Sequence, residues 1–344
     1  MSDFNINHIT GKQGQQGTVL AGVTTVSSTG SMRIPSGPTE QRGGRGRAVV
    51  HCGGYPSFIN TLNFIEITTT GNAQDFGDAI STGYGRGSFA SSTRAVIGGG
   101  SGSSYNFKIE YVTISSGGGA SDFGITSGSL ARRFLNGASN NTRGCFIGGH
   151  NPSNSPAMAM NIIDYVEIAT TGNATDFGDL NLGRSANGCC SSPIRGYTAG
   201  SQGSGPAFVT TNTIEYITFS TRGNAIDYGQ LSSPCQSLAG CSNATRGLFG
   251  GGNPGSITNV IHQITLTTSG TGEDFGDLTL ARTSIRGTSN SVRGLFVGGY
   301  TSPAEKNIID YVTIASAGNA TDFGDILAGG YNSASASDSH GGLG

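Results

Sequence analysis

The triplet Asp-Phe-Gly, once Asp-Tyr-Gly, is the repeated feature with the clearest chemical potential. In protein kinases such an aspartate holds the metal of a bound nucleotide, but no Gly-rich nucleotide loop, strand lysine or His-Arg-Asp loop accompanies it here. A carboxylate that recurs in every repeat also suits a structural role better than catalysis, because a catalytic group is not needed six times. We predict that each aspartate caps a turn or pairs with an arginine of its own or the next repeat. The six copies begin at Asp75, Asp122, Asp176, Asp227, Asp274 and Asp322.

A recurring arginine is the second candidate for such a tie. It precedes Gly or Ala, an apolar run and, in most copies, a Gly pair. In four of its five copies it follows the preceding Asp-Phe-Gly aspartate by 19 residues, so the spacing between the two motifs is nearly constant. The copies are Arg94, Arg143, Arg195, Arg246 and Arg293.

Histidine and cysteine show no metal-binding or redox motif. The five histidines lack ligand spacing, and no Asp-x-Asp-x-Asp calcium loop is present. We predict no catalytic residue, no metal and no cofactor. Cys190 and Cys241 each lie five residues before a recurring arginine, which gives them the same place in adjacent repeats. Free thiols are expected, with a Cys190–Cys241 bridge as the alternative because it needs Cα atoms within about 7 Å.

Composition excludes several classes of protein. A formal net charge of −2 with 12% charged residues offers no general attraction for nucleic acid or anionic lipid. No apolar stretch approaches the length that crosses a bilayer, so no membrane insertion is expected. The polar N-terminus lacks the layout of a secretory signal, which predicts synthesis in a cytosol.

The repeat indicates the fold. An acidic or polar residue stands 12 residues before every Asp-Phe-Gly aspartate, and each repeat reads as four short strands separated by turn residues. In the last repeat the strands are expected at 283–290, 293–299, 308–315 and 320–326. No apolar period of 3.6 residues is sustained, so helix should be nearly absent. We predict an all-β, six-bladed propeller over residues 45–344, with an extended N-terminal arm at 1–44.

The chain ends predict how the ring closes. The first repeat lacks a first strand, whereas a single strand follows the sixth Asp-Phe-Gly. Residues 335–338 align with the first-strand residues 287–290, so the C-terminal strand should pair with the second strand of the first repeat and cover two open edges. An open solenoid is the alternative.

The small polar residues that end the first strands are expected to line a central channel that holds water. They are Ser139-Asn140, Ser191-Ser192, Ser242-Asn243 and Ser289-Asn290.

Loops of variable length are the candidate binding surface. They follow the Gly pair on one predicted face, while the other spacings stay nearly constant, and such variation on a fixed scaffold is typical of a binding face. The alternative is that these loops vary because nothing constrains them. The loops are 55–62, 101–109, 150–163, 202–214, 253–261 and 300–309, and their candidate binding residues are Tyr55, Phe58, Tyr105, His150, Met158, Met160, Phe208 and Tyr300.

Each repeat resembles a kelch repeat in its inner strand of small residues, its Gly pair, its Tyr and its late aromatic residue, although the chain has no Trp. The repeat sequence NIIDYVTIASAGNATDFGDI at 307–326 resembles repeat proteins of marine tailed bacteriophages, cyanophages in particular. The segment IPSGPTEQR at 34–42 resembles a short element of phage tail-fibre proteins. The resemblance implies a non-enzymatic virion protein, tail-associated and oligomeric. Its arm would join other virion proteins, and its propeller would bind a host surface protein or glycan. The alternatives are an intracellular kelch-type scaffold and a propeller enzyme of galactose oxidase or sialidase type, for which the copper-site residues and the Asp box are missing.

Overall fold

The computed structural model describes residues 46–51, 53–54, 58–102, 106–151, 158–203 and 209–343, with the side chain of Met158 excluded. The predicted arm at 1–44 lies outside these residues. Within them, regular structure consists of strands and two single-turn 3₁₀ helices, η1 (Ser127–Ser129) and η2 (Gly341–Leu343). The predicted all-β class with almost no helix is confirmed.

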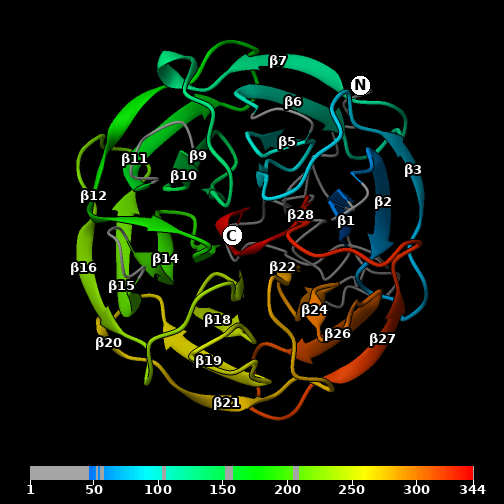
Figure 1. The fold of residues 1–344 in the computed structure, drawn as a ribbon, viewed down its shortest axis with the longest axis vertical. Helices are drawn as coiled ribbons and strands as arrows, with labels where there is room; N and C mark the ends of the chain where they lie inside the picture. The colour runs from blue at the N-terminus through cyan, green and yellow to red at the C-terminus, as the bar shows by residue number, and fades with distance from the viewer. Residues whose placement is uncertain are drawn as a thin grey trace, which may run out of the picture. The chain divides into compact units, whose positions relative to one another are not determined.

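Four sheets of four antiparallel strands stand around a common centre in a propeller-like arrangement, each with its first strand near the centre and its fourth at the rim (Figure 1). The first is β28 (Ala334–Ser337), β1 (Arg47–His51), β2 (Thr61–Glu66) and β3 (Gln74–Asp78). The second is β4 (Gly87–Ala90), β5 (Arg94–Gly98), β6 (Lys108–Thr113) and β7 (Ser121–Ile125). The third is β17 (Ala239–Ser242), β18 (Arg246–Gly250), β19 (Val260–Thr265) and β21 (Glu273–Asp277). The fourth is β22 (Arg286–Ser289), β23 (Arg293–Val297), β26 (Ile308–Thr313) and β27 (Thr321–Asp325).

A ten-stranded sheet replaces two of the six separate sheets expected from the sequence. Its strands are β8 (Asn136–Ser139), β9 (Arg143–Ile147), β10 (His150–Asn151), β11 (Met158–Glu167), β12 (Thr175–Ser185), β13 (Gly188–Ser191), β14 (Arg195–Gly203), β15 (Thr210–Thr218), β16 (Ile226–Gln230) and β20 (Gly270–Thr271). The prediction of six four-stranded sheets was therefore wrong in number. The merger arises because β12 and β14 are long enough to pair with each other, at Arg184 with Gly203 and Ser185 with Gln202. A separate hairpin joins β24 (Tyr300–Thr301) to β25 (Ala304–Glu305).

The constant spacing of 12 residues is a cross-strand pair. In every repeat the acidic or polar position faces the Asp-Phe-Gly aspartate across the third and fourth strands, directly beside a β-bulge. The pairs are Asn63–Asp75, Glu110–Asp122, Asp164–Asp176, Glu215–Asp227, His262–Asp274 and Asp310–Asp322.

Six left-handed residues, one before each first strand, form a cycle of backbone hydrogen bonds. Each N–H donates to the carbonyl of the equivalent residue in the preceding repeat, at 2.7–2.9 Å. The sixth bond runs from the Gly85 N–H to the Asn332 carbonyl and returns to the first member. Only one member is glycine, so the other five hold a backbone conformation that L residues seldom adopt. The members are Gly85, Phe134, Ala186, Ser237, Ser284 and Asn332, with φ between 53° and 67°.

The C-terminal strand β28 pairs with β1, as the alignment of the chain ends predicted. The register places Ala48 opposite Ser337 and His51 opposite Ala334. The core beside this pair is shared with the last repeat, since Val50 and Ile65 belong to the same buried cluster as Leu295. Six such clusters, each drawn from neighbouring repeats, make up the apolar core of the described residues.

The glycine of each Asp-Phe-Gly lies against the next repeat. Gly178 has φ of 148°, and a Cβ there would collide with the backbone of Gly223. The preceding residue, Phe177, accepts a hydrogen bond from the Gly223 N–H at 2.9 Å. The same close approach recurs from the last repeat to the first, where a Cβ on Gly324 would collide with Gly71.

We expect Gly178→Ala to lower the free energy of unfolding by about 1–3 kcal/mol, because the methyl group adds a collision to a backbone conformation that disfavours L residues. Gly172→Ala is the matched control, since nothing lies within 4 Å of its Cβ position. That change should stay within about 0.5 kcal/mol of the parent protein. Thermal and denaturant unfolding provide the measurement, and equal stability of the two variants would contradict the packing described.

Candidate functional site

The loops after the second strands share a face with the cycle of left-handed residues. In four repeats an isolated bridge joins the segment before the first strand to the loop of the same repeat, at Tyr84–Ser101, Arg133–His150, Gln236–Asn253 and Thr283–Tyr300. Antiparallel order places the ends of all second strands on this side of the sheets. The structure therefore supports one common loop face. Of its predicted residues, Tyr55, Tyr105, Phe208 and the side chain of Met158 lie outside what the structure describes.

An aromatic and cationic cluster lies on this loop face, across the first three repeats. Phe58 stacks on Tyr84 with ring centroids 5.5 Å apart, and Tyr84 meets Phe134 edge-on at 5.6 Å. The Arg133 guanidinium lies 4.9 Å from the centre of the Phe134 ring and donates to the Tyr84 hydroxyl at 2.9 Å. It also reaches Nδ1 of His150 at 3.4 Å. Burial, followed by the nearby Arg133 charge, lowers the pKa of His150, so its ring is a neutral acceptor here.

Two of the predicted loop residues, Met158 and Met160, belong to a strand instead. Strand β11 begins at Met158, which pairs with Asn151, and Met160 lies opposite Arg184 of β12. The predicted loop 150–163 is shorter than expected because this pairing extends the third strand. Tyr300 opens the β24–β25 hairpin, where its ring lies 5.7 Å from that of Tyr331.

The cluster was only partly visible in the sequence. Phe58 and His150 lie in the variable loops, whereas Tyr84, Arg133 and Phe134 come from the segments before the first strands. Tyr331, Tyr84 and Arg133 occupy the same repeat position, where other repeats have Ser185, Gln236 and Thr283. Alignment of the repeats on their first strands was the signal that could have found them.

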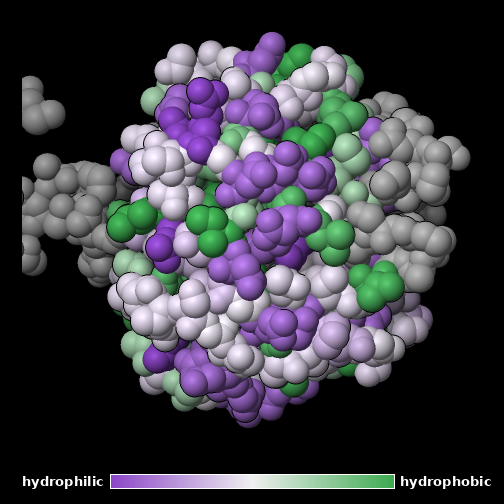
Figure 2. Space-filling model, turned by 90° about the vertical axis from the view of Figure 1, so that its left-hand side faces the viewer, coloured by the Kyte–Doolittle hydropathy of each residue, from purple (hydrophilic) through white to green (hydrophobic). Residues whose placement is uncertain are grey.

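Large apolar side chains elsewhere are scattered. Figure 2 shows one side of the molecule with isolated apolar residues among polar ones. Such single residues are normal on a protein surface. Within the described residues, those exposed by more than half are Ile80, Ile194, Val209, Ile226 and Leu327.

The predicted role of the Asp-Phe-Gly aspartates was wrong. Their side chains point to solvent, because strand alternation turns the following aromatic ring inward. Among the described residues none of the six carboxylates, from Asp75 to Asp322, forms an ion pair or a side-chain hydrogen bond. What this triplet contributes is the buried ring and the close-packed glycine.

Four of the five recurring arginines tie neighbouring repeats through backbone carbonyls. Arg94 donates to the carbonyls of Ile168 and Ala169 in the next repeat, at 3.1 and 2.8 Å. Arg293 does the same from the last repeat to the first, at Ile67 and Thr68. Arg246 donates to Ile314, Arg143 to Phe219, and Arg195 covers the Tyr216 ring at 4.2 Å.

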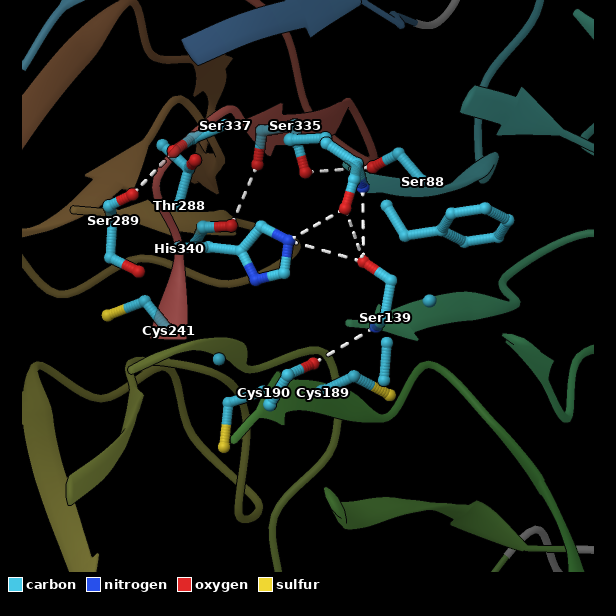
Figure 3. Close-up of a pocket in the computed structure, with 18 of the residues that line it drawn as sticks. Ser88, Ser139, Cys189, Cys190, Cys241, Thr288, Ser289, Ser335, Ser337 and His340 are labelled. Atoms are coloured by element: carbon cyan, nitrogen blue, oxygen red, sulfur yellow. Dashed lines mark hydrogen bonds between the residues drawn. The ribbon is translucent and has the colours of Figure 1, made fainter. Parts of the chain in front are cut away.

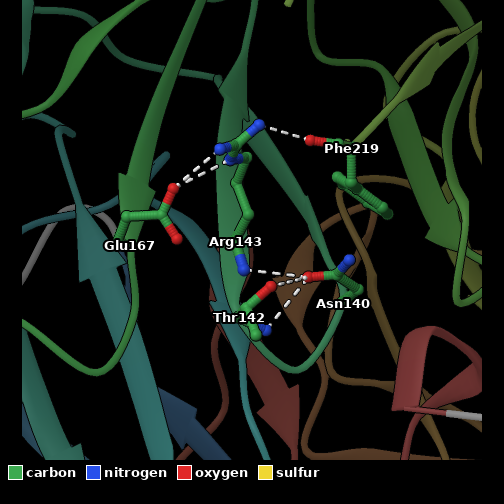
Figure 4. Close-up of polar contacts among 5 residues, drawn as sticks. All are labelled: Asn140, Thr142, Arg143, Glu167 and Phe219. Atoms are coloured by element: carbon green, nitrogen blue, oxygen red, sulfur yellow. Dashed lines mark hydrogen bonds and ion pairs between the residues drawn. The ribbon is translucent and has the colours of Figure 1, made fainter. Parts of the chain in front are cut away.

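Figure 4 shows one such tie. Arg143 reaches Phe219 of the next repeat with one end of its guanidinium and Glu167 of its own repeat with the other. Asn140 holds the turn before it, since its Oδ1 accepts from the N–H groups of Thr142 and Arg143. Asn243 and Asn290 bond in the same way. These asparagines therefore cap turns, and the prediction that they line the channel was wrong.

Four buried ion pairs replace the expected Asp-Phe-Gly ties. They are Arg86–Glu110, Arg132–Asp164, Arg184–Glu215 and Arg282–Asp310, the last two at 3.0 and 2.7 Å. All eight side chains are at most 2% exposed. Burial lowers the pKa of each of these arginines, and the partner carboxylate opposes that shift.

The two repeats without an acid also lack the arginine. Cys235 stands at the arginine position of the His262 repeat, and its Sγ contacts the Gly251 carbonyl at 3.5 Å. Arg132 and Arg282 donate to the equivalent carbonyls of Gly148 and Gly298. In the first repeat the corresponding residues are Gly330 and Asn63. Arginine and acid thus change together at these positions in five repeats. In the second repeat Gly83 stands at the arginine position, and Arg86, three residues later, pairs with Glu110 instead.

A small polar cavity lies on the axis of the sheets (Figure 3). Its volume is about 50 Å³, enough for water, and the serines that line it mostly bond to backbone of the neighbouring repeat. Ser242 Oγ, for example, donates to the Ser191 carbonyl at 2.6 Å. The imidazole of His340 enters from the C-terminal turn, with Nε2 2.9 Å from the Ala90 carbonyl and Nδ1 accepting from the Gly342 N–H. Of the predicted serines, Ser139, Ser191, Ser242 and Ser289 line this cavity, whereas the Ser192 hydroxyl accepts from the Arg195 N–H in the turn instead.

The cavity cysteines are free thiols. Cys189, Cys190 and Cys241 line it, and no disulfide joins Cys190 to Cys241. Burial raises the pKa of Cys189 and Cys241 to about 12, so neither is a thiolate nucleophile near neutral pH. Cys145 and Cys235 are free and buried as well.

Comparison with known proteins leaves the family open. No protein-family model matches the chain, and no curated protein matches it. Across the described ranges no group of three His, Cys, Asp or Glu side chains could hold a metal ion. No helix there has the length and apolar character to cross a membrane.

We predict strong coupling between Arg282 and Asp310. Asp310→His alone leaves a buried guanidinium without its carboxylate and should lower the free energy of unfolding by about 3–5 kcal/mol. The double variant Arg282→Cys/Asp310→His copies the pair found at Cys235 and His262, so it should regain at least half of that loss. A double-mutant cycle of denaturant unfolding measures the coupling. Additive effects of the two changes would show that the side chains do not depend on each other.

Acid should destabilise the protein through His51. Burial, with a further contribution from the Arg86 charge, lowers its pKa to about 3, whereas an unfolded histidine titrates near 6.5. The unfolded chain therefore binds the proton first, and stability is lost as pH falls from 7 to 4, on the order of 3 kcal/mol from this residue. His51→Val places at this site the residue found at the equivalent Val297 and should flatten the pH dependence of stability. Equal pH dependence in both proteins would contradict the assignment.

Proposed function

We propose that residues 45–344 form a closed six-bladed propeller, in which the ten-stranded sheet counts as two blades joined by the β12–β14 pairing. The cycle of six hydrogen bonds supports this count, because each repeat contributes one member and the sixth bond returns to Gly85. The six apolar clusters support it too, since each spans one boundary between neighbouring repeats. On this proposal β28 completes the first blade and joins the two ends of the chain.

We propose that the propeller is a non-enzymatic binding module whose working surface is the loop face. The observation that carries this is the cluster of Phe58, Tyr84, Phe134 and Arg133. Aromatic rings and arginine dominate recognition surfaces because they combine apolar area with hydrogen bonding. Their position beside the cycle of backbone bonds holds them on a rigid base, which lowers the entropy lost on binding.

The resemblance of the repeats to phage proteins extends the proposal to a virion. The chain would be a tail-associated structural component that oligomerises through residues 1–44 and contacts a host surface protein or glycan through the loop face. An intracellular kelch-type scaffold would use the same face and is the second candidate. The described geometry gives little support to a galactose oxidase or sialidase type of enzyme, because the axial cavity of about 50 Å³ is smaller than a sugar site and is lined by serines and protonated thiols.

We expect Tyr84→Ala/Arg133→Ala to reduce attachment of the protein to phage host cells at least about tenfold, because it removes the centre of the cluster. Gln236→Ala/Thr283→Ala is the matched control at the same position of two other repeats and should bind like the parent protein. Attachment is measured by flow cytometry with labelled protein, and immunogold labelling of virions tests the location. Unchanged attachment of the first variant would overturn the role of the loop face, and unlabelled particles would overturn the virion assignment.

A further inference from the structure

The fifth repeat breaks the aromatic pattern. In the other five repeats the residue after the acidic or polar position is aromatic, and an arginine guanidinium lies 4.2–4.8 Å from the centre of its ring. The arginine is a recurring one in four of these repeats and Arg47, at the equivalent place, in the first. In this repeat Gln263 takes that place and Arg246 has no ring beneath it. The five rings are Phe64, Tyr111, Tyr165, Tyr216 and Tyr311.

A polar cavity of about 250 Å³ occupies the space at Gln263. It lies along β19 and β21, drawn in yellow in Figure 1, at the ends of the strands opposite to the loop face. Both Arg246 and Gln263 line it, with the carboxylate of Glu273 at one side. Four residues with aliphatic hydroxyl groups also line it, Thr265, Thr268, Ser269 and Thr271, together with Tyr228, Ile264 and Gly270.

The wall of this cavity is held by the neighbouring repeat. Tyr228 is the one Tyr among the six Asp-Phe-Gly aromatics, and the single proton of its hydroxyl is shared between the carbonyls of Thr265 and Thr268, at 2.6 and 2.5 Å. Strand β20 (Gly270–Thr271) pairs with β16, which fixes the other side of the loop. A phenylalanine could not donate these bonds, so the Tyr at 228 and the Gln at 263 together shape the site. The cavity is consequently formed before any ligand arrives.

The polar groups of the lining are incompletely satisfied. Gln263 Oε1 is buried without a hydrogen-bond partner, while its Nε2 lies 3.5 Å from Glu273 Oε2. Arg246 donates to the Ile314 carbonyl and forms no ion pair with Glu273 among the described residues. The amide nitrogen of Gln263 and the carboxylate of Glu273 are exposed and only weakly bonded to each other, so they remain open to stronger hydrogen bonds from a ligand.

We propose that this cavity binds one neutral monosaccharide unit of a glycan. Each sugar hydroxyl both donates and accepts, which matches an arginine, a carboxylate, an amide nitrogen and several hydroxyls along the cavity. Arg246 and Glu273 together leave no excess charge that would favour a simple anion or cation. The volume lies below the range of drug-sized sites, so one ring is the expected occupant. The site goes beyond the proposed function, because it lies on the opposite side from the loop face and uses none of its residues.

Saturation-transfer NMR and calorimetry on the full chain test the proposal, with methyl glycosides of glucose, galactose, mannose and N-acetylglucosamine as probes. At least one glycoside should bind saturably. Gln263→Tyr installs the residue that fills this space in four other repeats and should weaken that binding at least about tenfold without lowering the melting temperature. The matched control, Tyr311→Phe, keeps a ring at the same position of the next repeat and should bind like the parent protein.

Two results would overturn the proposed sugar site. In the first, none of the four glycosides binds the parent protein; in the second, Gln263→Tyr binds a glycoside as tightly as the parent protein does. If Gln263→Tyr does not fold, Glu273→Gln serves instead, since that side chain is exposed, and unchanged glycoside affinity in this variant overturns the proposal equally. Tyr84→Ala/Arg133→Ala should leave glycoside binding unchanged, which separates this site from the loop face.

Discussion

The cycle of backbone hydrogen bonds between the six left-handed residues is the constraint on which the other features depend. Each bond of 2.7–2.9 Å joins one repeat to the one before it, close to the axis where the inner strands begin. A left-handed non-glycine residue costs of the order of 1 kcal/mol, and five repeats accept that cost. Such a conformation persists only where the surroundings determine it fully. The cycle therefore fixes the angle at which every repeat meets its neighbour.

Outward from this cycle the contacts between repeats change in kind. Around the axial cavity, serine hydroxyls bond to backbone of the adjacent inner strand, as Ser289 does to Ser242 at 2.6 Å. Apolar clusters fill the middle, and at the rim the recurring arginines and the Asp-Phe-Gly glycines reach the next repeat. Few of these contacts involve complementary charge, which agrees with a chain that has 12% charged residues. Backbone groups are the common partner, so side chains on the loops can vary without loss of these contacts between repeats.

The sequence predicted well what recurs at fixed spacing. The expected strands of the last repeat match β22, β23, β26 and β27, and the pairing of the C-terminal strand with β1 followed from aligning the chain ends. The partners of the charged groups could not be predicted in this way. A fixed distance of 12 residues identifies Asp310 and Asp322 as neighbours. The first lies on the inner of the two strands, buried against Arg282, whereas the second lies on the outermost strand and is exposed.

Differences between repeats proved as informative as their shared features. The loss of an acid with its arginine at His262 and Cys235, and the replacement of an aromatic ring by Gln263, each mark a local change in structure. The merger of two sheets had no such marker, because it depends on strand lengths in β12 and β14 that turn residues did not limit. Only some residues of the loop face were found, since several of its side chains come from outside the loops.

Hydrogen exchange of single amides tests the central claim, that the six repeats form one closed ring joined by the C-terminal strand. The amide protons of Phe134, Ala186, Ser237 and Ser284 lie within the ring, whereas those of Gly85 and Asn332 hold the C-terminal segment to its two neighbours. A closed ring predicts comparable protection for all six, within roughly tenfold, because they open together. Protection of the four interior amides combined with rapid exchange at Gly85, Asn332 and the β1–β28 pair would contradict closure.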